Sequence, residues 1–230
     1  MNTNKIDLIS YTRIGLAQAY YKALGYLNIE TPWLVSPQAI TATLPPDARL
    51  VQSNFGCLVG SGEQGFIQLM LDKKLEPGRY QTTTPCFRDE KEQTELTRPY
   101  FVKTELIWYM PSVEVRLAYE TVLNNALNCF FEISDAEAFN AVQTNEGFDI
   151  VFNGIELGSY GVRKMEDHVW VFGTGLAEPR FSQVVQRHYG PNGYPQIDSS
   201  DDTSSGQNTP LDPDTSYQPE QLSLPLEMSE

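Results

Sequence analysis

The sequence predicts an α+β fold in which helices flank one antiparallel sheet. A helical repeat of apolar residues runs from Ile6 to Gly25, and a second one runs from Val113 to Ile133. Between them, Tyr80 to Phe87 and Tyr100 to Met110 alternate in hydrophobicity on either side of a polar loop, which is typical of paired antiparallel strands. Because each helical pattern is apolar on one side, we expect the helices to pack on the sheet that the strands form.

Shorter elements complete this plan. Leu27 to Val35 is expected to be a strand, and Gln64 to Lys74 a short amphipathic helix that stops at the turn residues Glu76-Pro77-Gly78. Strand patterns return in the last third of the domain, before a final helix. These strands are expected at Phe148 to Ile155, Gly161 to Arg163 and Val169 to Phe172.

The composition divides the chain into one folded domain, residues 1–189, and a tail, residues 190–230. A chain of 230 residues with 40% hydrophobic content is long enough to bury one core. The tail has eight acidic residues, six prolines and no lysine or arginine, so it carries −8 of the net charge of −14. Such a composition buries too little apolar surface to offset its ordering entropy, and we expect the tail to be disordered.

The cysteine pattern and the absence of long apolar segments indicate a cytoplasmic protein. Cys57, Cys86 and Cys129 lie far apart and form no C-x-x-C pair, so neither a disulfide framework nor a zinc site is suggested. The N-terminus has no charged-then-apolar leader, and no apolar stretch approaches the ~20 residues that a membrane helix needs. We therefore expect no membrane partner.

Arg88 and Glu90 predict the first part of an ATP site. They stand two residues apart at the end of a strand pattern, so both side chains are expected on one face. The planar guanidinium group of arginine matches a phosphate, and a glutamate can accept a hydrogen bond from an adenine amino group or a substrate ammonium.

Two later segments add the other groups that such a site needs. Asp149, Glu156 and Ser159 offer three oxygen ligands of the kind that Mg2+ prefers beside a polyphosphate. The segment from Gly173 to Arg180 (GTGLAEPR) is predicted to be a Gly-x-Gly turn that enters a helix, where close backbone approach and a cation would meet the nucleotide. The sequence thus predicts ATP and Mg2+ as cofactors.

In this order, the segments resemble the three motifs of class II aminoacyl-tRNA synthetases, most closely the aspartate, asparagine and lysine subgroup and the related ammonia-dependent asparagine synthetase. Motif 1 is matched by Tyr20 to Pro37, with Pro32 at the family's dimer seam. Motif 2 is matched by Phe87 to Glu90, and motif 3 by Gly173 to Arg180 with Ala177 in place of the third glycine. The resemblance covers roughly residues 6 to 188. It implies a six- or seven-stranded antiparallel sheet and a homodimer through the Pro32 region.

The resemblance also implies roles for the ATP-site residues. Arg88 would bridge the substrate carboxylate and the α-phosphate, and Glu90 would bind the adenine amino group. Phe101 would stack on adenine, and Arg180 would close its other face or contact the γ-phosphate, so Arg88 and Arg180 are the implied catalytic residues. Asp149, Glu156 and Ser159 match the family's Mg2+ ligands. The residues implied to contact ATP are Arg88, Glu90, Phe101, Glu156, Gly173, Gly175 and Arg180.

Arg163 implies a substrate of the aspartate or asparagine type. Members of the subgroup that act on these amino acids carry an arginine seven residues after the metal glutamate, and a guanidinium fits a carboxylate or an amide oxygen. Lys103 stands where these members often have glutamine, and two roles are open for it: it would supply a cation for the substrate or it would block the site. Ile67 replaces a lysine that binds an acidic side chain, which leaves open whether aspartate or a relative is the substrate. The loop that contacts the substrate ammonium in the family is here formed by Ser61, Glu63 and Gln64.

The leading hypothesis is an ATP-dependent ligase that forms an aminoacyl-adenylate and passes the acyl group to an acceptor. Ammonia, another small amine, a protein lysine and a nucleic acid are all open as acceptors. No segment resembles the subgroup's anticodon-binding barrel, and the acidic net charge disfavours an extended tRNA surface, so tRNA binding is open as well. The alternative is a catalytically silent paralogue that serves as a regulatory or binding subunit.

Overall fold

The computed structural model describes residues 9–45, 48–89, 91, 94, 96–110, 115–134 and 139–189. The chain divides into two units between Gln196 and Ile197, and every described residue belongs to the first. The tail expected at residues 190–230 and the site residue Glu90 lie outside the described residues.

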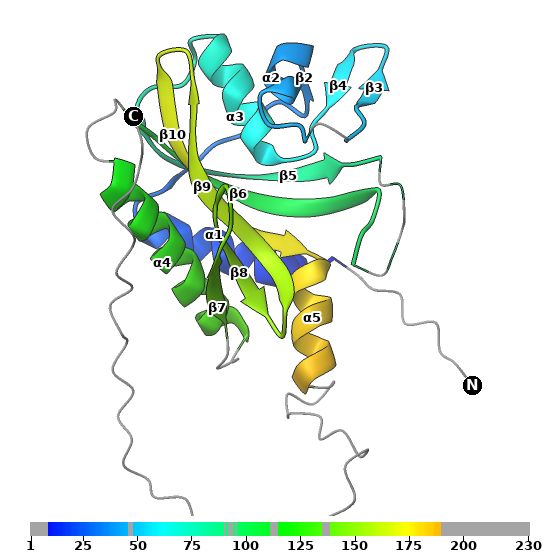
Figure 1. Cartoon of the computed structure of the whole chain (residues 1–230), viewed down its shortest axis with the longest axis vertical. Helices are drawn as coiled ribbons and strands as arrows, with labels where there is room; N and C mark the ends of the chain where they lie inside the picture. Colours follow the sequence, from blue (N-terminus) through cyan, green and yellow to red (C-terminus); the bar gives the residue numbers. More distant parts are fainter. Residues whose placement is uncertain are drawn as a thin grey trace, which may run out of the picture. The chain divides into compact units, whose positions relative to one another are not determined.

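A seven-stranded sheet forms the centre of the domain, in the order β1-β5-β6-β10-β9-β8-β7 (Figure 1). Neighbouring strands are antiparallel except β1 and β5, which are parallel. The α+β prediction with one sheet flanked by helices is therefore confirmed. The strands are β1 (Leu27–Asn28), β5 (Gly78–Phe87), β6 (Tyr100–Met110), β7 (Asn140–Gln143), β8 (Gly147–Phe152), β9 (Ile155–Met165) and β10 (His168–Glu178).

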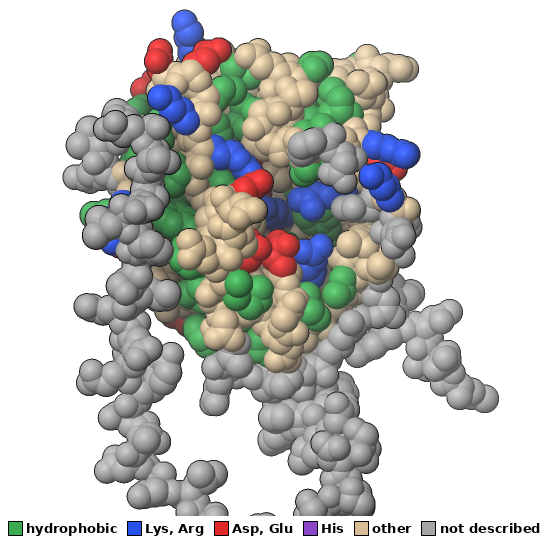
Figure 2. Space-filling view, viewed as in Figure 1, with side chains coloured by type: hydrophobic (Ala, Val, Ile, Leu, Met, Phe, Trp, Pro, Cys, Tyr) green, Lys and Arg blue, Asp and Glu red, His purple; other side chains and the backbone are tan. Residues whose placement is uncertain are grey.

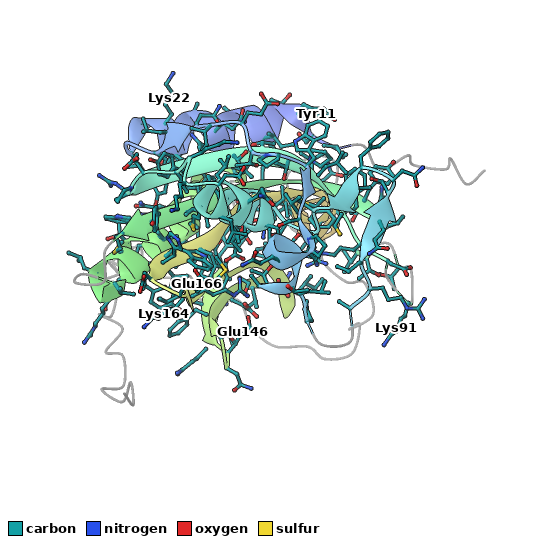
Figure 3. The ribbon with its side chains drawn as sticks, turned by 90° about the horizontal axis from the view of Figure 1, so that it is seen from above. Tyr11, Lys22, Lys91, Glu146, Lys164 and Glu166 are labelled. Carbon is teal, nitrogen blue, oxygen red and sulfur yellow. The ribbon has the colours of Figure 1, made fainter. Side chains whose placement is uncertain are left out.

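Helices cover both faces of this sheet. Helix α1 (Tyr11–Ala23) packs closely on one face, where a Cβ atom added at Gly175 of β10 would meet Tyr21. Helix α3 (Gly62–Leu71) packs closely on the other face, where a Cβ atom added at Gly62 would meet Glu105 of β6. Helix α4 (Val115–Ser134) lies beside α1, and α5 (Arg180–Tyr189) follows β10 directly. In Figure 3, α1, which carries the labelled Tyr11 and Lys22, lies on the opposite side of the sheet from the labelled Glu146.

A second, three-stranded sheet packs with α3 and the short α2 (Pro37–Thr41). Its strands, in the order β2-β4-β3, are β2 (Leu34–Val35), β3 (Val51–Ser53) and β4 (Gly56–Leu58). The single strand expected from Leu27 to Val35 is wrong, because the segment leaves the large sheet after β1 and enters the small one at β2. Pro32, which has no N–H to donate to a strand ladder, lies in the crossing between them.

The turn expected at Gly173 and Gly175 is also wrong, because both residues lie inside β10 and the helix begins only at Arg180. A Cβ atom at Gly173 would lie 2.6 Å from the ring of Tyr160 and 2.8 Å from Val122 of α4. These glycines therefore allow α4 and α1 to approach the sheet closely, and they face away from α3.

Candidate functional site

Two adjoining cavities lie on the face of the sheet that carries α3. We call them the small cavity, with a volume of about 60 Å³, and the large cavity, with a volume of about 660 Å³. Arg88 and Lys103 line both of them. Figure 2 shows side chains of both charges gathered around a hollow near the centre of the view. Two ligands bound in the two cavities would therefore meet at a pair of cations.

Arg88 is fixed by the loop that precedes α3. Its backbone N–H donates to the carbonyl of Pro99 at 2.9 Å, and its side-chain Nε donates to the carbonyl of Gly60 at 3.2 Å. The centre of its guanidinium group lies 4.9 Å from the centroid of the Phe101 ring. Because this cation covers the aromatic face, a base that stacked on Phe101 would displace the Arg88 side chain.

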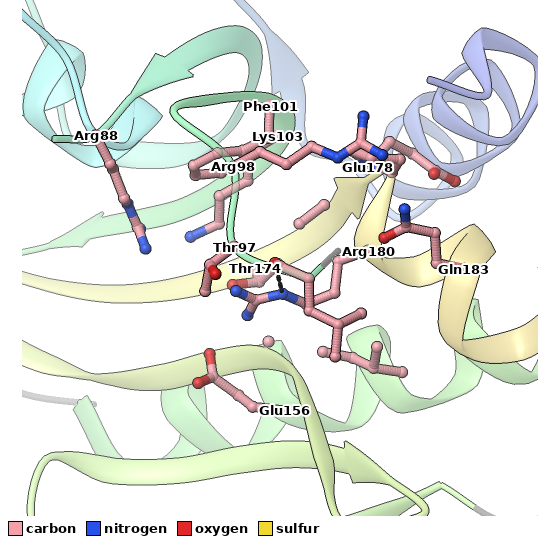
Figure 4. A pocket seen from close by; sticks show the side chains of 15 residues that line it. Arg88, Thr97, Arg98, Phe101, Lys103, Glu156, Thr174, Glu178, Arg180 and Gln183 are labelled. Carbon is pink, nitrogen blue, oxygen red and sulfur yellow. Dashed lines mark hydrogen bonds between the residues drawn. The ribbon is translucent and has the colours of Figure 1, made fainter. Parts of the chain in front are cut away.

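Arg180 and Glu156 also line the small cavity, together with the charged residues Arg98 and Glu178 (Figure 4). Arg180 Nε donates to the carbonyl of Leu96 at 3.3 Å, which ties the start of α5 to the loop between β5 and β6. The structure thus brings Arg88, Phe101, Glu156 and Arg180 together around one cavity. The other predicted ATP-site residues that the structure describes, Gly173 and Gly175, line neither cavity.

Asp149, Glu156 and Ser159 lie together on the hairpin of β8 and β9. Asp149 pairs with Ser159 in the strand register, and a β-bulge at Leu157 brings Glu156 and Ser159, which are three residues apart, to the same side of the sheet. Asp149 Oδ1 is buried and has no hydrogen-bond partner among the described residues. Burial raises the pKa of Asp149, and a hydrogen bond with Ser159 opposes that shift.

No group of three or more His, Cys, Asp or Glu side chains in the described ranges could hold a metal ion by itself. A hydroxyl and two carboxylates are nevertheless the hard oxygen donors that Mg2+ binds, and a nucleotide phosphate supplies the remaining ligands in sites of this kind. The unpartnered oxygen of Asp149 fits such a site, although Asp149 lines neither cavity.

The loop before α3 forms one wall of the large cavity, and its polar side chains stabilise the start of the helix. Ser61 Oγ accepts a hydrogen bond from the backbone N–H of Glu63 at 3.2 Å, and Gln64 Oε1 accepts from that of Gly60 at 2.7 Å. Both predicted residues, Ser61 and Gln64, therefore line the cavity while capping α3. Ile67 is fully buried in the apolar cluster below and does not line the cavity.

Arg163 and Glu63 form an ion pair inside the large cavity. The other oxygen of Glu63 accepts from Trp170 Nε1 at 2.7 Å, and Arg163 also pairs with Glu146 at 3.0 Å. The guanidinium carbon lies 4.0 Å from the centroid of the Phe172 ring. Arg163 is thus held at one position in the cavity by two carboxylates and an aromatic face.

Lys103 pairs with Glu105 at 2.9 Å near the boundary of the two cavities, where Glu105 is buried and Lys103 is partly buried. Burial raises the pKa of Glu105, and the neighbouring Lys103 lowers it. Sequence reasoning missed Glu105, although its spacing of two residues from Lys103 in a strand places both side chains on one face. It also missed Glu146 and Trp170, for which no local pattern in the sequence gives a signal.

No protein-family model and no curated protein sequence matches the chain. Solved structures do match it. Pyrrolysyl-tRNA synthetase from Desulfitobacterium hafniense has a TM-score of 0.58 at 16% identity, over 76% of this chain and 71% of that one. Cytoplasmic serine-tRNA ligase from Naegleria fowleri, solved with AMP, has a TM-score of 0.60 at 15% identity, over 81% of this chain and 50% of that one. Seryl-tRNA synthetase from Pyrococcus horikoshii, solved with ATP, has a TM-score of 0.61 at 15% identity, over 74% of this chain and 48% of that one.

The domain therefore has the catalytic fold of class II aminoacyl-tRNA synthetases. The match extends over about half of the seryl enzymes. It does not distinguish the aspartate, asparagine and lysine subgroup from the others. No described helix is both long and apolar enough to cross a membrane.

Proposed function

We propose that the protein is an ATP-dependent ligase that converts an amino acid into an aminoacyl-adenylate. The observation that carries this proposal is the sharing of Arg88 and Lys103 by the two cavities. A nucleotide in the small cavity would displace the Arg88 side chain from the face of Phe101, stack on that ring and direct its phosphates towards the boundary, where the displaced Arg88 would meet them. An amino acid in the large cavity would direct its carboxylate to the same place. Two anions that must react with each other would then share two cations.

The reaction needs little covalent chemistry from the protein. An oxygen of the amino-acid carboxylate attacks the α-phosphorus, a carboxyl–phosphate bond forms, and the bond to the pyrophosphate leaving group breaks in line with it. Arg88 and Lys103 oppose the negative charge that gathers at phosphorus, a form of stabilisation that is strongest in the transition state. No protein base is required, because the attacking carboxylate is already ionised at neutral pH.

Mg2+ would be held by Glu156, Ser159 and Asp149 together with the phosphates. When bound, it would neutralise phosphate charge and orient the leaving group. The chain's own contribution is to place Glu156 at the small cavity and Ser159 at the large one, on the β8–β9 hairpin that also carries Asp149.

The substrate proposed for the large cavity is an amino acid of the aspartate or asparagine type, with the neutral amide favoured. Arg163 has five N–H donors, and its contacts with Glu63 and Glu146 leave donors for an amide oxygen. A substrate carboxylate would enter beside those two carboxylates and be repelled by them. Lys103 lies at the boundary of the two cavities, where it would meet the phosphates, so it would add little positive charge beside Arg163.

A homodimer through the Pro32 region is part of the proposal. Around Pro32, large apolar side chains are exposed: Leu27 by 60%, Trp33 by 48% and Leu34 by 41%. Exposed apolar residues close together in space are typical of surfaces that bind another protein, and a second copy of this chain is the proposed partner. Light scattering at micromolar concentration tests this, and a monomer mass would contradict it.

The decisive experiment is ATP–pyrophosphate exchange with the purified protein, Mg2+ and each of the twenty amino acids in turn. Exchange that depends on asparagine, or on asparagine and aspartate, supports the proposal. Exchange with an unrelated amino acid would retain the ligase and overturn the substrate class. ATP binding without exchange for any amino acid or acceptor would favour the alternative, a catalytically silent paralogue that serves as a binding subunit.

A further inference from the structure

Gln183 of α5 lines the small cavity but has no role in the proposed reaction. Its side chain is 7% exposed, and neither its amide oxygen nor its amide nitrogen has a hydrogen-bond partner among the described residues. Figure 4 shows the amide in the wall of the cavity, beyond Arg180 and across from Glu156. The backbone N–H of Gln183 donates to the carbonyl of Pro179 at 3.0 Å, so the residue is anchored in the first turn of the helix.

A buried amide without partners is unfavourable, because it has lost its hydrogen bonds to water and gained none in return. Native proteins contain few such groups, and one that lines a cavity is explained when a ligand completes its hydrogen bonds. Here both the donor and the acceptor of one amide lack partners, so the missing ligand should offer an acceptor beside a donor.

The rest of the small cavity indicates what kind of ligand this is. Phe101 offers a flat aromatic face once a ligand displaces the Arg88 side chain, and Leu157, Ala177 and Pro179 add apolar surface. An apolar slot with a few placed polar groups is typical of small-molecule sites, and a flat heteroaromatic ring satisfies both features. Adenine carries an exocyclic amino donor next to a ring-nitrogen acceptor, and a glutamine amide can bond to both at once.

We propose that Gln183 reads the amino-bearing edge of the base and makes the small cavity selective for adenine nucleotides. This inference rests on the proposed function only in that the small cavity binds a nucleotide. It adds a specificity-determining residue on α5 to Glu90, which the resemblance implies for the adenine amino group, and to the residues expected to stack on the base or to contact the phosphates.

The test compares the binding of two nucleotides by calorimetry: ATP and purine riboside triphosphate, which lacks the exocyclic amino group. The full chain is compared with Gln183→Met, which keeps the length of the side chain and removes both polar atoms. Gln52→Met is the matched control, because Gln52 is exposed on β3 and lines neither cavity. Thermal unfolding verifies that each variant folds, and Gln183→Leu replaces Gln183→Met if the latter does not.

We expect the unaltered protein and Gln52→Met to bind ATP about tenfold or more tightly than purine riboside triphosphate, and Gln183→Met to lose that preference. A preference that persists in Gln183→Met, or that is absent from the unaltered protein, overturns the inference but leaves the ligase proposal intact. If the unaltered, folded protein binds neither nucleotide, the small cavity is no nucleotide site, and the proposed function fails together with the inference.

Discussion

Arg163 and Glu63 form an ion pair although they are 100 positions apart in the chain. The resemblance implies separate roles for them, with Arg163 holding the side chain of the substrate and Glu63 contacting the substrate ammonium. Their pairing means that these two charges in the large cavity neutralise each other, while Glu146 adds a second carboxylate to the arginine. The charge that a substrate side chain meets at Arg163 is therefore set by three residues from different parts of the fold.

Glu146→Gln should shift the preference of the protein from asparagine towards aspartate. Glu146 is exposed, and its carboxylate lies 3.0 Å from Arg163, so its removal lowers the repulsion of a substrate carboxylate. Because the pair is solvent-screened, we expect a change of only roughly two- to fivefold in the ratio of the two exchange rates. Glu76→Gln, which removes an exposed carboxylate that lines neither cavity, is the control. An unchanged ratio in Glu146→Gln would show that Glu146 has no part in charge selection.

Arg88→Ala should abolish amino-acid-dependent exchange while the fold remains intact. The guanidinium group is exposed and contacts the surface of Phe101 and one backbone carbonyl, so its loss removes little packing. If it stabilises the transition state, the exchange rate should fall by about 10² to 10³. Arg116→Ala, which removes an exposed arginine of α4 outside both cavities, should retain full exchange. Exchange by Arg88→Ala at the original rate would remove Arg88 from the mechanism.

The paired strands β5 and β6 and the long helices could be predicted from the sequence because each has a periodic pattern. β5 pairs with β6 along its whole length, as their alternation indicates: Gly78 lies opposite Tyr109 at one end, and Phe87 lies opposite Tyr100 at the other. The crossing between the two sheets near Pro32 and the small sheet itself could not be predicted. Strands of two or three residues are too short for a period, and their positions follow from tertiary packing.

The position of Glu156 shows a second limit of sequence reasoning. In a regular strand, side chains an odd number of residues apart point to opposite faces, which would separate Glu156 from Ser159 and from Arg163. The bulge at Leu157 adds one residue to the strand, so that Glu156, Ser159 and Arg163 point to the same face and line the two adjoining cavities. A bulge has no reliable local pattern, and the grouping could be reached only through the resemblance to a family in which these residues act together.

Gly173→Ala should destabilise the fold, because the glycine allows α4 to pack closely on β10. An added Cβ would lie 2.6 Å from Tyr160 and 2.8 Å from Val122, both fully buried. Overpacking of this kind costs about 1–3 kcal/mol. Gly15→Ala is the matched control, since a Cβ there meets nothing within 4 Å and alanine favours the helix by roughly 0.5–1 kcal/mol. Urea unfolding of both variants measures the difference, and equal stability of Gly173→Ala and the unaltered protein would refute this account of the glycine.

Glu178→Gln should change how stability depends on pH. Glu178 is fully buried, and burial raises the pKa of its carboxyl from 4.5 to about 7, although hydrogen bonding from Ser182 and the charge of Arg13 lower it. The folded state therefore holds this proton more tightly than the unfolded state does. Its contribution to stability is complete below pH 4.5 and is lost as the pH rises to about 7.

Glutamine is neutral throughout this range and can still accept the hydrogen bond from Ser182. Relative to Glu178→Gln, the unaltered protein should accordingly lose up to about 3 kcal/mol of unfolding free energy between pH 4.5 and pH 8. Urea titrations at several pH values measure this difference. A constant difference in unfolding free energy between the unaltered protein and Glu178→Gln from pH 4.5 to 8 would contradict this prediction. The carboxyl would then have the same pKa in the folded and unfolded states, and its burial would have no electrostatic consequence.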